Sequence, residues 1–271
     1  MNLEQIINSE FTKRKILNLK NKTKMNILLI GYGKMGRMIE EIALERNHKI
    51  VHTIDNDYQW KTLEGKEVDI AIDFSIPMLA DYNIMECFNR DIPIVVGTTG
   101  WYNKLPSLRT YCQENNKSMF VASNYSIGVY IFNQINQALA KLMNNQPSYD
   151  VSMEEVHHTQ KLDAPSGTAI TLAENIIDNI DRKTKWSCIE ERDMIDEGIE
   201  KSHKDNELLI YSKRIGDVTG NHTINYISDI DQITITHKAY NRKGFALGAV
   251  LAAEFLKNKK GFYTMKDMIN K

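Results

Sequence analysis

Cysteine is scarce in this sequence of 271 residues, and long apolar runs are missing from it. The three cysteines, Cys87, Cys112 and Cys188, are odd in number and widely spaced, which excludes a disulfide framework and fits no pattern of zinc ligands. We therefore expect a protein of a reducing compartment and predict a cytoplasmic location. Because no run approaches the roughly 18 consecutive apolar residues of a membrane span, we expect no contact with a membrane.

The sequence also lacks an excess of charge of either sign. Lys and Arg together number 34, against 35 for Asp and Glu, which gives a formal net charge of -1. This balance argues against a protein that binds the nucleic-acid backbone. With 42% hydrophobic and 25% charged residues, the composition is typical of a folded globular protein with one large domain or two ordinary ones.

Residues 1–24 differ in character from the rest of the chain. They are rich in Lys and Asn and contain no Gly. The apolar stretch of a signal peptide is missing from them, and Glu4 and Glu10 argue against a transit peptide. We interpret this segment as an accessory N-terminal extension, with Met25, directly before the first apolar run, as an alternative start.

Short apolar runs alternate with amphipathic stretches from Met25 onward. Strands that alternate with helices are typical of right-handed crossovers and of a parallel, doubly wound α/β sheet. We predict strands at 26–30, 49–54, 68–74, 92–96 and 119–122, and helices at 34–46, 78–89 and 105–115.

The pattern changes after Pro147. Alternating segments separated by turn residues predict a smaller sheet with antiparallel or mixed pairing. We expect helices at 127–143 and 245–256, a helix that starts after Pro165, and strands at 150–157, 208–213, 222–228 and 232–239. The domains are then a dinucleotide-binding domain at 25–126, completed by 240–271, and a second domain at 127–239.

A glycine-rich turn joins the first predicted strand to the first predicted helix. Its residues match the pattern G-x-G-x-x-G, and they are Gly31, Tyr32, Gly33, Lys34, Met35 and Gly36. In this context the first glycine permits a tight turn, the second lets a pyrophosphate approach the backbone, and the third allows close packing of helix and strand. The N-terminus of the helix attracts the phosphates, so the turn predicts a Rossmann-type dinucleotide site.

Asp55 ends the second predicted strand, 24 residues after Gly31. A carboxylate at this place accepts hydrogen bonds from the adenosine ribose hydroxyls. Asn56 and Asp57 follow it, and neither can meet a 2′-phosphate with positive charge. The cofactor is therefore NADH or NADPH with NADH favoured, although Lys34 or Lys61 offers an alternative source of positive charge.

Two further loops follow the fourth and fifth strands, at the edge where ligands of such sheets bind. The first contains Gly97, Thr98, Thr99 and Gly100, and the second contains Ser123, Asn124, Tyr125 and Ser126. Small hydroxyl and amide side chains suit the nicotinamide end of a dinucleotide. Ordinary turn chemistry explains each loop equally well when it is taken alone.

The densest group of reactive side chains lies between residues 154 and 168. Its histidines allow three interpretations. Metal ligation together with Glu154 or Glu155 is disfavoured, because His157 and His158 point to opposite faces of a strand. In the second interpretation, the histidines have a purely structural role. In the third, an imidazole and the Lys161 ammonium converge on a carboxylate substrate. The helix that follows, capped by Ser166 or Thr168, offers an anion site, so we favour the third.

This segment resembles the signature of the 4-hydroxy-tetrahydrodipicolinate (dihydrodipicolinate) reductase family. The matching run is E-V-H-H-T-Q-K-L-D-A-P-S-G-T-A, at 155–169. The resemblance continues through the glycine turn, D-F-S at 73–75, V-G-T-T-G at 96–100, S-N-Y-S-I-G-V at 123–129, R-I-G-D-V-T-G-N-H-T at 214–223, R-K-G-F-A-L-G-A at 242–249 and G-F-Y-T-M at 261–265.

The resemblance implies a role for each matching residue. His157 is the proton donor or acceptor, Lys161 is a proton donor, and His158 with the turn of Ser166, Gly167 and Thr168 holds the carboxylates of a dicarboxylate substrate. Cofactor contacts fall on the glycine turn, Asp55, Gly97 to Thr99, and the segment Ala122, Ser123, Asn124 and Tyr125. The implied fold is a Rossmann-type domain plus an α+β domain on a mixed sheet, which builds a homotetramer and binds the substrate.

The implied reaction is the NAD(P)H-dependent reduction of 4-hydroxy-tetrahydrodipicolinate in lysine and diaminopimelate biosynthesis, without a metal. A sugar dehydrogenase is a rival, but it would carry E-K-P after the fourth strand, where G-T-T-G stands. An aspartate-semialdehyde dehydrogenase needs a nucleophilic cysteine, but Cys87 and Cys112 lie in predicted helices, and Cys188 has no supporting base nearby in the sequence. A nucleotide-binding regulator without activity is a third alternative, against which the intact His157 and Lys161 argue.

Overall fold

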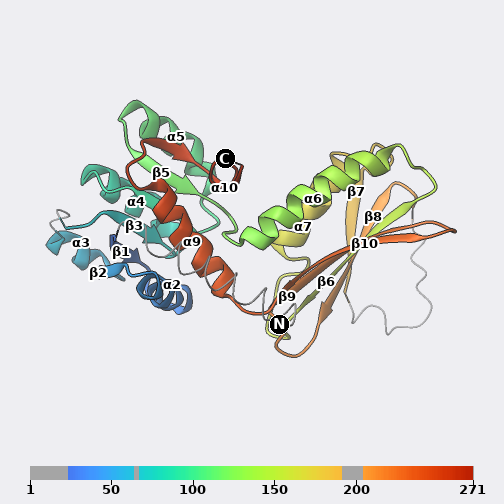
Figure 1. Ribbon diagram of the computed structural model, residues 1–271, viewed down its shortest axis with the longest axis horizontal. Helices are drawn as coiled ribbons and strands as arrows, with labels where there is room; N and C mark the ends of the chain where they lie inside the picture. Colours follow the sequence, from blue (N-terminus) through green and yellow to red (C-terminus); the bar gives the residue numbers. More distant parts are fainter. Residues whose placement is uncertain (1–23, 64–66, 191–203, 271) are drawn as a thin grey trace, which may run out of the picture. The chain divides into compact units, whose positions relative to one another are not determined.

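The computed structural model describes residues 24–63, 67–190 and 204–270 (Figure 1). The chain divides into two compact units: unit 1 runs to Tyr125 and resumes at Phe245, and unit 2 is Ser126–Gly244. The predicted N-terminal extension, apart from Lys24, lies outside the described residues. Among the helices that the structure describes, none combines the length and apolar character that crossing a membrane requires.

Unit 1 is built on a six-stranded parallel sheet, and the order of its strands is β11-β5-β4-β3-β1-β2. The strands are β1 (Asn26–Ile30), β2 (Lys49–Ile54), β3 (Ile70–Asp73), β4 (Ile94–Val96), β5 (Ser118–Val121) and β11 (Gly261–Tyr263). Every residue of β3, β4 and β5 is buried, as expected for strands covered on both faces. The predicted doubly wound parallel sheet is confirmed.

Helices cover both faces of this sheet. They are α2 (Lys34–Glu45), α3 (Asp57–Thr62), α4 (Ala80–Asn89), α5 (Leu105–Glu114), α9 (Lys243–Leu256) and α10 (Met265–Ile269). Residues of α4 and α5 share one apolar cluster with alternate strand residues such as Leu28 and Ala71. On the other face, Phe255 of α9 meets Phe120 of β5 edge to face, with ring centroids 6.0 Å apart.

The order of the strands reverses at β1, which lies between β2 and β3. In open α/β sheets, ligands bind beyond the carboxyl ends of the strands at such a switch point. The glycine turn leaves β1 at this end of the sheet, and Gly31 donates a backbone hydrogen bond to the carbonyl of Ile54, the last residue of β2, at 2.7 Å. The topology thus brings the glycine turn and the end of β2 together.

Unit 2 contains a mixed five-stranded sheet in the order β10-β9-β6-β8-β7, with α6 and α7 on one face (Figure 1). Its elements are α6 (Ile127–Asn144), β6 (Asp150–His157), α7 (Gly167–Ile177), β7 (Lys185–Glu190), β8 (Glu207–Arg214), β9 (Gly220–Ile227) and β10 (Gln232–Ala239). Strand β6 pairs in parallel with β8 and antiparallel with β9. The predicted mixed sheet is confirmed.

Among the α-helices and strands that the structure describes, four were not predicted: α3, β7, β11 and α10. The sequence shows no clear period over these short segments. Strand β11 exists because residues 261–263 pair in parallel with β5 at the edge of the sheet. The strands expected at 68–74 and 92–96 are shorter, at Ile70–Asp73 and Ile94–Val96. The helix expected from Met78 begins as a 3-10 turn, Pro77–Leu79.

Candidate active site

The glycine turn of unit 1 has the backbone geometry that its motif implies. Gly31 has a positive φ of 84°, and a Cβ atom on it would lie 2.5 Å from the carbonyl oxygen of Phe74. A Cβ atom on Gly36 would lie 2.3 Å from the carbonyl oxygen of Gly31. Both positions therefore require glycine for the turn and for the packing of α2 against it.

Gly33 is different, because a Cβ atom there would meet no atom within 4 Å. It is the N-cap of α2, and no side chain caps this helix within the described structure. Lys34 and Met35 follow, and the first turn contains no acidic residue. The N–H groups of this helix end are thus available to an anion, and the space over Gly33 lets a pyrophosphate reach them.

Asp55 lies beside the glycine turn. Its carboxylate accepts a hydrogen bond from the backbone N–H of Tyr32 at 3.3 Å, and its side chain is otherwise exposed. The side chain of Gln59 on α3 accepts from the backbone N–H of Asp55, at 2.5 Å, and from that of Asn56, at 3.1 Å. Helix α3, which the sequence analysis missed, therefore shapes the loop that presents this carboxylate.

The loop of Gly97, Thr98 and Thr99 rests on a buried carboxylate, Asp73, at the end of β3. The Thr98 hydroxyl donates to Asp73 Oδ1 at 2.8 Å and accepts from the backbone N–H of Ser75 at 2.9 Å. Burial raises the pKa of Asp73, although the hydrogen bonds that its carboxylate accepts from Ser75, Thr98 and Asn83 oppose this shift. Thr98 is buried and Thr99 exposed, so Thr99 is the hydroxyl of this loop that a ligand can reach.

The segment from Ala122 to Tyr125 follows β5. Tyr125 is buried, and its hydroxyl donates to the carbonyl of Val96 at 2.7 Å, so this side chain belongs to the core of unit 1. Ser123 is exposed, whereas Ala122 and Asn124 are half-buried. Of the predicted contacts in this segment, the side chain of Ser123 is the most accessible to a cofactor.

None of the three cysteines has the setting of a nucleophile. Cys87 and Cys112 are buried in the apolar cluster of unit 1. Burial raises the pKa of Cys87 well above its usual range and that of Cys112 to about 11. Cys188 lies on β7, half-buried. A thiolate mechanism like that of a semialdehyde dehydrogenase has no support here.

In unit 2, strand β6 carries the first predicted catalytic residue. Its alternate residues Val151, Met153, Glu155 and His157 are buried, so Glu155 and His157 share the face that packs on the helices. His157 ends the strand, and His158 begins the loop that follows and is half-buried. The two histidines therefore have different surroundings, as their positions in the sequence predicted.

Lys161 lies in this loop. Its ammonium contacts both carboxylate oxygens of Asp163, each at 2.7 Å. The guanidinium of Arg214, at the end of β8, donates to the carbonyl of Lys161 at 3.2 Å and to that of Asp163 at 2.6 Å. Arg214 thus holds the loop that presents Lys161. In the sequence, Arg214 is marked only as the first residue of the matching run at 214–223.

The N-terminal turn of helix α7 is the predicted site for the substrate carboxylates. Ser166 is its N-cap and accepts a hydrogen bond from the backbone N–H of Ala169 at 3.2 Å. A Cβ atom on Gly167 would meet nothing within 4 Å, and the first turn has no acidic residue. Gly167 is exposed and Thr168 half-buried, so this helix end can accept a carboxylate.

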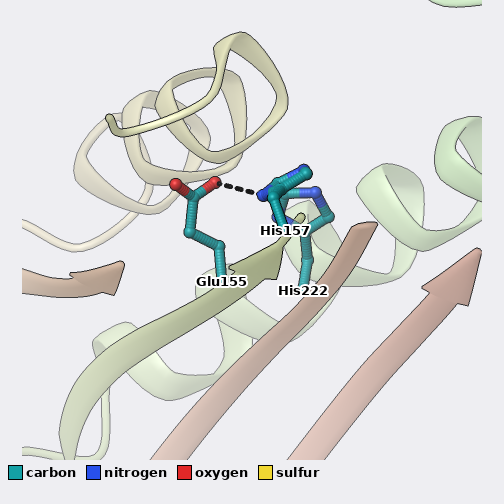
Figure 2. Close-up of side chains that lie close together, drawn as sticks. All are labelled: Glu155, His157 and His222. Carbon is teal, nitrogen blue, oxygen red and sulfur yellow. Dashed lines mark ion pairs between the residues drawn. The ribbon is translucent and has the colours of Figure 1, made fainter. Parts of the chain in front are cut away.

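Two buried side chains surround His157 (Figure 2). Its Nδ1 lies 3.5 Å from Glu155 Oε2, and its ring lies edge to face with that of His222 on β9, with ring centroids 5.2 Å apart. Burial lowers the pKa of His157, and burial with the nearby His157 lowers that of His222 to about 4. Both imidazoles are therefore neutral at neutral pH. In the sequence, His222 is marked only by its place in the matching run at 214–223, which does not pair it with His157.

The same three side chains form a donor set of the type that binds zinc. However, both oxygens of Glu155 already accept hydrogen bonds from the backbone N–H of Ser166, and one also accepts from Ser212. The metal pairing considered from the sequence, His157 with His158, is not the arrangement in the structure, because only His157 of the two belongs to this group.

Two models of known protein families match this chain. A family model described as the N-terminus of dihydrodipicolinate reductase matches residues 25–125, and one described as its C-terminus matches residues 128–269. The chain belongs to the dihydrodipicolinate reductase family. The family resemblance inferred from the motifs is confirmed.

Curated members of the dihydrodipicolinate reductase family are similar along their whole length. The 4-hydroxy-tetrahydrodipicolinate reductase of Christiangramia forsetii is 47% identical over 246 residues, which cover 91% of this chain and 98% of the relative. The reductase of Staphylococcus saprophyticus is 36% identical over 257 residues, which cover 90% of this chain and 100% of the relative. A solved dihydrodipicolinate reductase from Paenisporosarcina sp. TG-14, with bound dipicolinate, shares the fold with a TM-score of 0.73 at 22% identity, over 91% of this chain and all of the other.

Proposed function

We propose that this chain acts as a 4-hydroxy-tetrahydrodipicolinate reductase in which His157 and Lys161 supply the proton that accompanies hydride transfer. The reductase activity follows from membership of the family, and it places the chain in lysine and diaminopimelate biosynthesis. The observation that carries the assignment of residues is the grouping in unit 2 of a buried imidazole, a positioned ammonium and a helix N-terminus open to an anion.

The glycine turn, Asp55 and Thr99 fit a dinucleotide cofactor. The phosphates would bind at the uncapped N-terminus of α2, over Gly33, and the ribose hydroxyls would bind Asp55. When bound, the nicotinamide supplies a hydride to the ring of the substrate. The family uses NADH or NADPH, and we propose a preference for NADH, because the charge of Asp55 repels a 2′-phosphate and Asn56 after it is uncharged.

The substrate ring carries two carboxylates, and unit 2 offers cationic and N–H groups that suit them. We assign the carboxylates to the N-terminal turn of α7, at Ser166, Gly167 and Thr168, with His158 as a further partner. No residue of the first turn of this helix is acidic, and the buried carboxylate of Glu155 accepts the N–H of the N-cap residue Ser166. These contacts position the dianion and stabilise the charge that moves onto the ring nitrogen.

Reduction adds a hydride to one ring carbon and a proton to its neighbour, so the protein must deliver one proton in each turnover. The Lys161 ammonium, which contacts Asp163, is a proton donor to the substrate ring. Burial lowers the pKa of His157, so its imidazole is neutral at rest and can accept a proton and exchange it with the substrate. Solvent restores the proton that is delivered in each turnover.

A direct assay tests the proposed function. Freshly synthesised 4-hydroxy-tetrahydrodipicolinate is mixed with reduced cofactor and the full-length protein, and the loss of cofactor absorbance is followed. We expect one cofactor oxidised for each substrate consumed and a higher kcat/KM with NADH than with NADPH. Cofactor loss that does not depend on substrate, or none with either cofactor, contradicts the proposal.

The Asp55→Ala variant tests the ribose contact. Removing the carboxylate takes away both the hydrogen-bond acceptor and the repulsion of a 2′-phosphate. We expect weaker NADH binding, measured by titration, and a smaller difference between NADH and NADPH. Unchanged NADH affinity in this variant rules out the contact.

We also propose that the protein is a homotetramer built through the second face of the unit 2 sheet. Both α6 and α7 pack on the first face, where Ile210 and Ile224 are buried. Alternate residues such as Tyr211 and Thr223 face the other way and are half-buried in a single copy. A second copy of this sheet is the occupant we expect, and the mass of the protein in solution, measured by light scattering, tests it.

A further inference from the structure

Glu155 is a fully buried carboxylate at the centre of unit 2. Its oxygens accept the backbone N–H of Ser166, at 3.1 Å to each oxygen, and the hydroxyl of Ser212, at 2.7 Å. The guanidinium of Arg214 lies 3.6 Å away. Burial alone would raise the pKa of Glu155, but the hydrogen bonds from Ser166 and Ser212 and the nearby His157 hold it below its usual range. The carboxylate is therefore charged at neutral pH.

The imidazole of His157 lies between the carboxylate of Glu155 and two residues of β9, Gly220 and His222. Its Nδ1 lies 3.5 Å from Glu155 Oε2, within reach of a hydrogen bond after a small rotation. Within the described structure, Nδ1 has no other hydrogen-bond partner. On the other side, a Cβ atom on Gly220 would lie only 3.0 Å from Nε2, so the absence of a side chain there makes room for the ring. His222 packs edge to face against it.

We propose that Glu155 is a positioning residue that fixes the Nδ1–H tautomer of His157 and, through Ser166, the N-terminal turn of α7. One carboxylate then sets the orientation of the proton-transfer group relative to the turn assigned to the substrate carboxylate (Figure 2). With Nδ1 donating to Glu155, the lone pair of Nε2 is left to exchange protons. The inference rests on the proposed function, since Glu155 acts through His157 and this turn.

Several charged or titratable groups act on His157 besides Glu155. Arg214 lies on β8, His222 on β9, and Lys161 and Asp163 in the loop. His237 on β10 acts on His222 in turn. Of these, only Glu155 and Asp163 favour the charged imidazolium. Loss of the charge of Glu155 should therefore lower the pKa of His157 further and make it a weaker proton acceptor.

The Glu155→Gln variant separates the two roles of the carboxylate. Glutamine keeps an oxygen that can accept from Ser166 but loses the charge that faces His157. We expect kcat to fall by about ten- to a hundredfold, as when the partner of a functional histidine is removed, while KM changes by less than about twofold. The acid limb of the pH profile of kcat should move to lower pH, because the pKa of His157 falls. Glu155→Ala removes both contacts and should also raise KM.

Glu154→Gln is the matched control. Glu154 is the preceding residue of β6, on the opposite face of the strand, and its carboxylate pairs with Lys213 Nζ at 2.6 Å. This variant loses a charge of the same kind one residue away, so we expect wild-type kinetics and a wild-type pH profile. A folded Glu155→Gln protein with wild-type kcat and pH profile overturns the proposal.

Nuclear magnetic resonance of the wild-type protein gives a second test, which does not depend on the folding of the Glu155 variants. With 15N-labelled histidine, and His157→Ala to assign the signal, we expect His157 to be in the Nδ1–H form above its pKa. The Nε2–H form overturns the proposal. If His157→Ala and Lys161→Ala both keep wild-type turnover, the proposed role of these two residues fails; if His157→Ala is inactive while Glu155→Gln is normal, only the present inference fails.

Discussion

Glu155 and His222 lie directly opposite each other in the antiparallel pairing of β6 with β9, although 67 residues separate them in the chain. His157, two residues after Glu155 on the same face, therefore has a carboxylate on one side and a neutral imidazole on the other. This register explains why the predicted proton-transfer residue is enclosed by these two groups; burial lowers the pKa of His157, against the opposing effect of Glu155.

Replacement of either His157 or Lys161 by alanine should reduce turnover by about 10²- to 10⁴-fold, the usual contribution of an acid or base. NADH binding should stay unchanged, because the cofactor residues belong to unit 1. Steady-state kinetics and NADH titration measure the two effects separately. Lys141→Ala, which removes an exposed lysine at the end of α6, serves as a control and should behave as wild type. Normal turnover in both active-site variants would remove the assignment.

Two glycines of the cofactor turn should respond differently to alanine. Gly33→Ala adds a methyl group where no atom lies within 4 Å, so we expect an unchanged Tm but a weaker affinity for NADH. Gly36→Ala places the methyl group 2.3 Å from the carbonyl oxygen of Gly31, so we expect a lower Tm as well. Thermal unfolding and NADH titration of both variants check this. Equal NADH affinity of wild type and Gly33→Ala would contradict a phosphate site at this position.

Gly167→Ala tests the carboxylate site in unit 2. The added methyl group meets nothing within 4 Å, and alanine at the start of a helix should leave stability unchanged or raise it by up to about 1 kcal/mol. A substrate carboxylate held by this turn would meet the methyl group, so KM for the substrate should rise several-fold while KM for the cofactor stays constant. If neither KM changes, the carboxylate binds elsewhere.

The stability of the protein should fall as the pH falls from about 6.5 towards 4. Burial lowers the pKa of His222 to about 4, whereas in the unfolded chain it is about 6.5. Between these values the unfolded chain binds more protons, so the free energy of unfolding decreases as the pH falls, by up to about 3 kcal/mol from this residue. The contribution of His222 to stability is fully present above a pH of about 6.5, the pKa of histidine in the unfolded chain. Tm measured at several pH values checks this, and His222→Phe, which keeps a ring but not the proton site, should flatten the curve; an identical slope would refute it.

Much of the fold was readable from the sequence because its signals are local. The alternating runs from Met25 predicted the parallel sheet, and the glycine spacing at 31–36 predicted the turn after β1. Short elements were missed where their existence depends on a partner: β11 has three residues and forms by pairing with β5. Likewise α3 has six residues, and its Gln59 side chain accepts from the backbone N–H groups of Asp55 and Asn56.

The sequence by itself determined which residues of the loop after β6 are chemically reactive, and strand alternation put Glu155 and His157 on one face. Only the tertiary structure decided what surrounds them. Arg214 reaches the loop from β8 and His222 reaches His157 from β9, because strand pairing brings together segments far apart in the chain. The spacing of residues within one strand is fixed by covalent geometry, whereas the register between strands is set by the packing of the whole sheet.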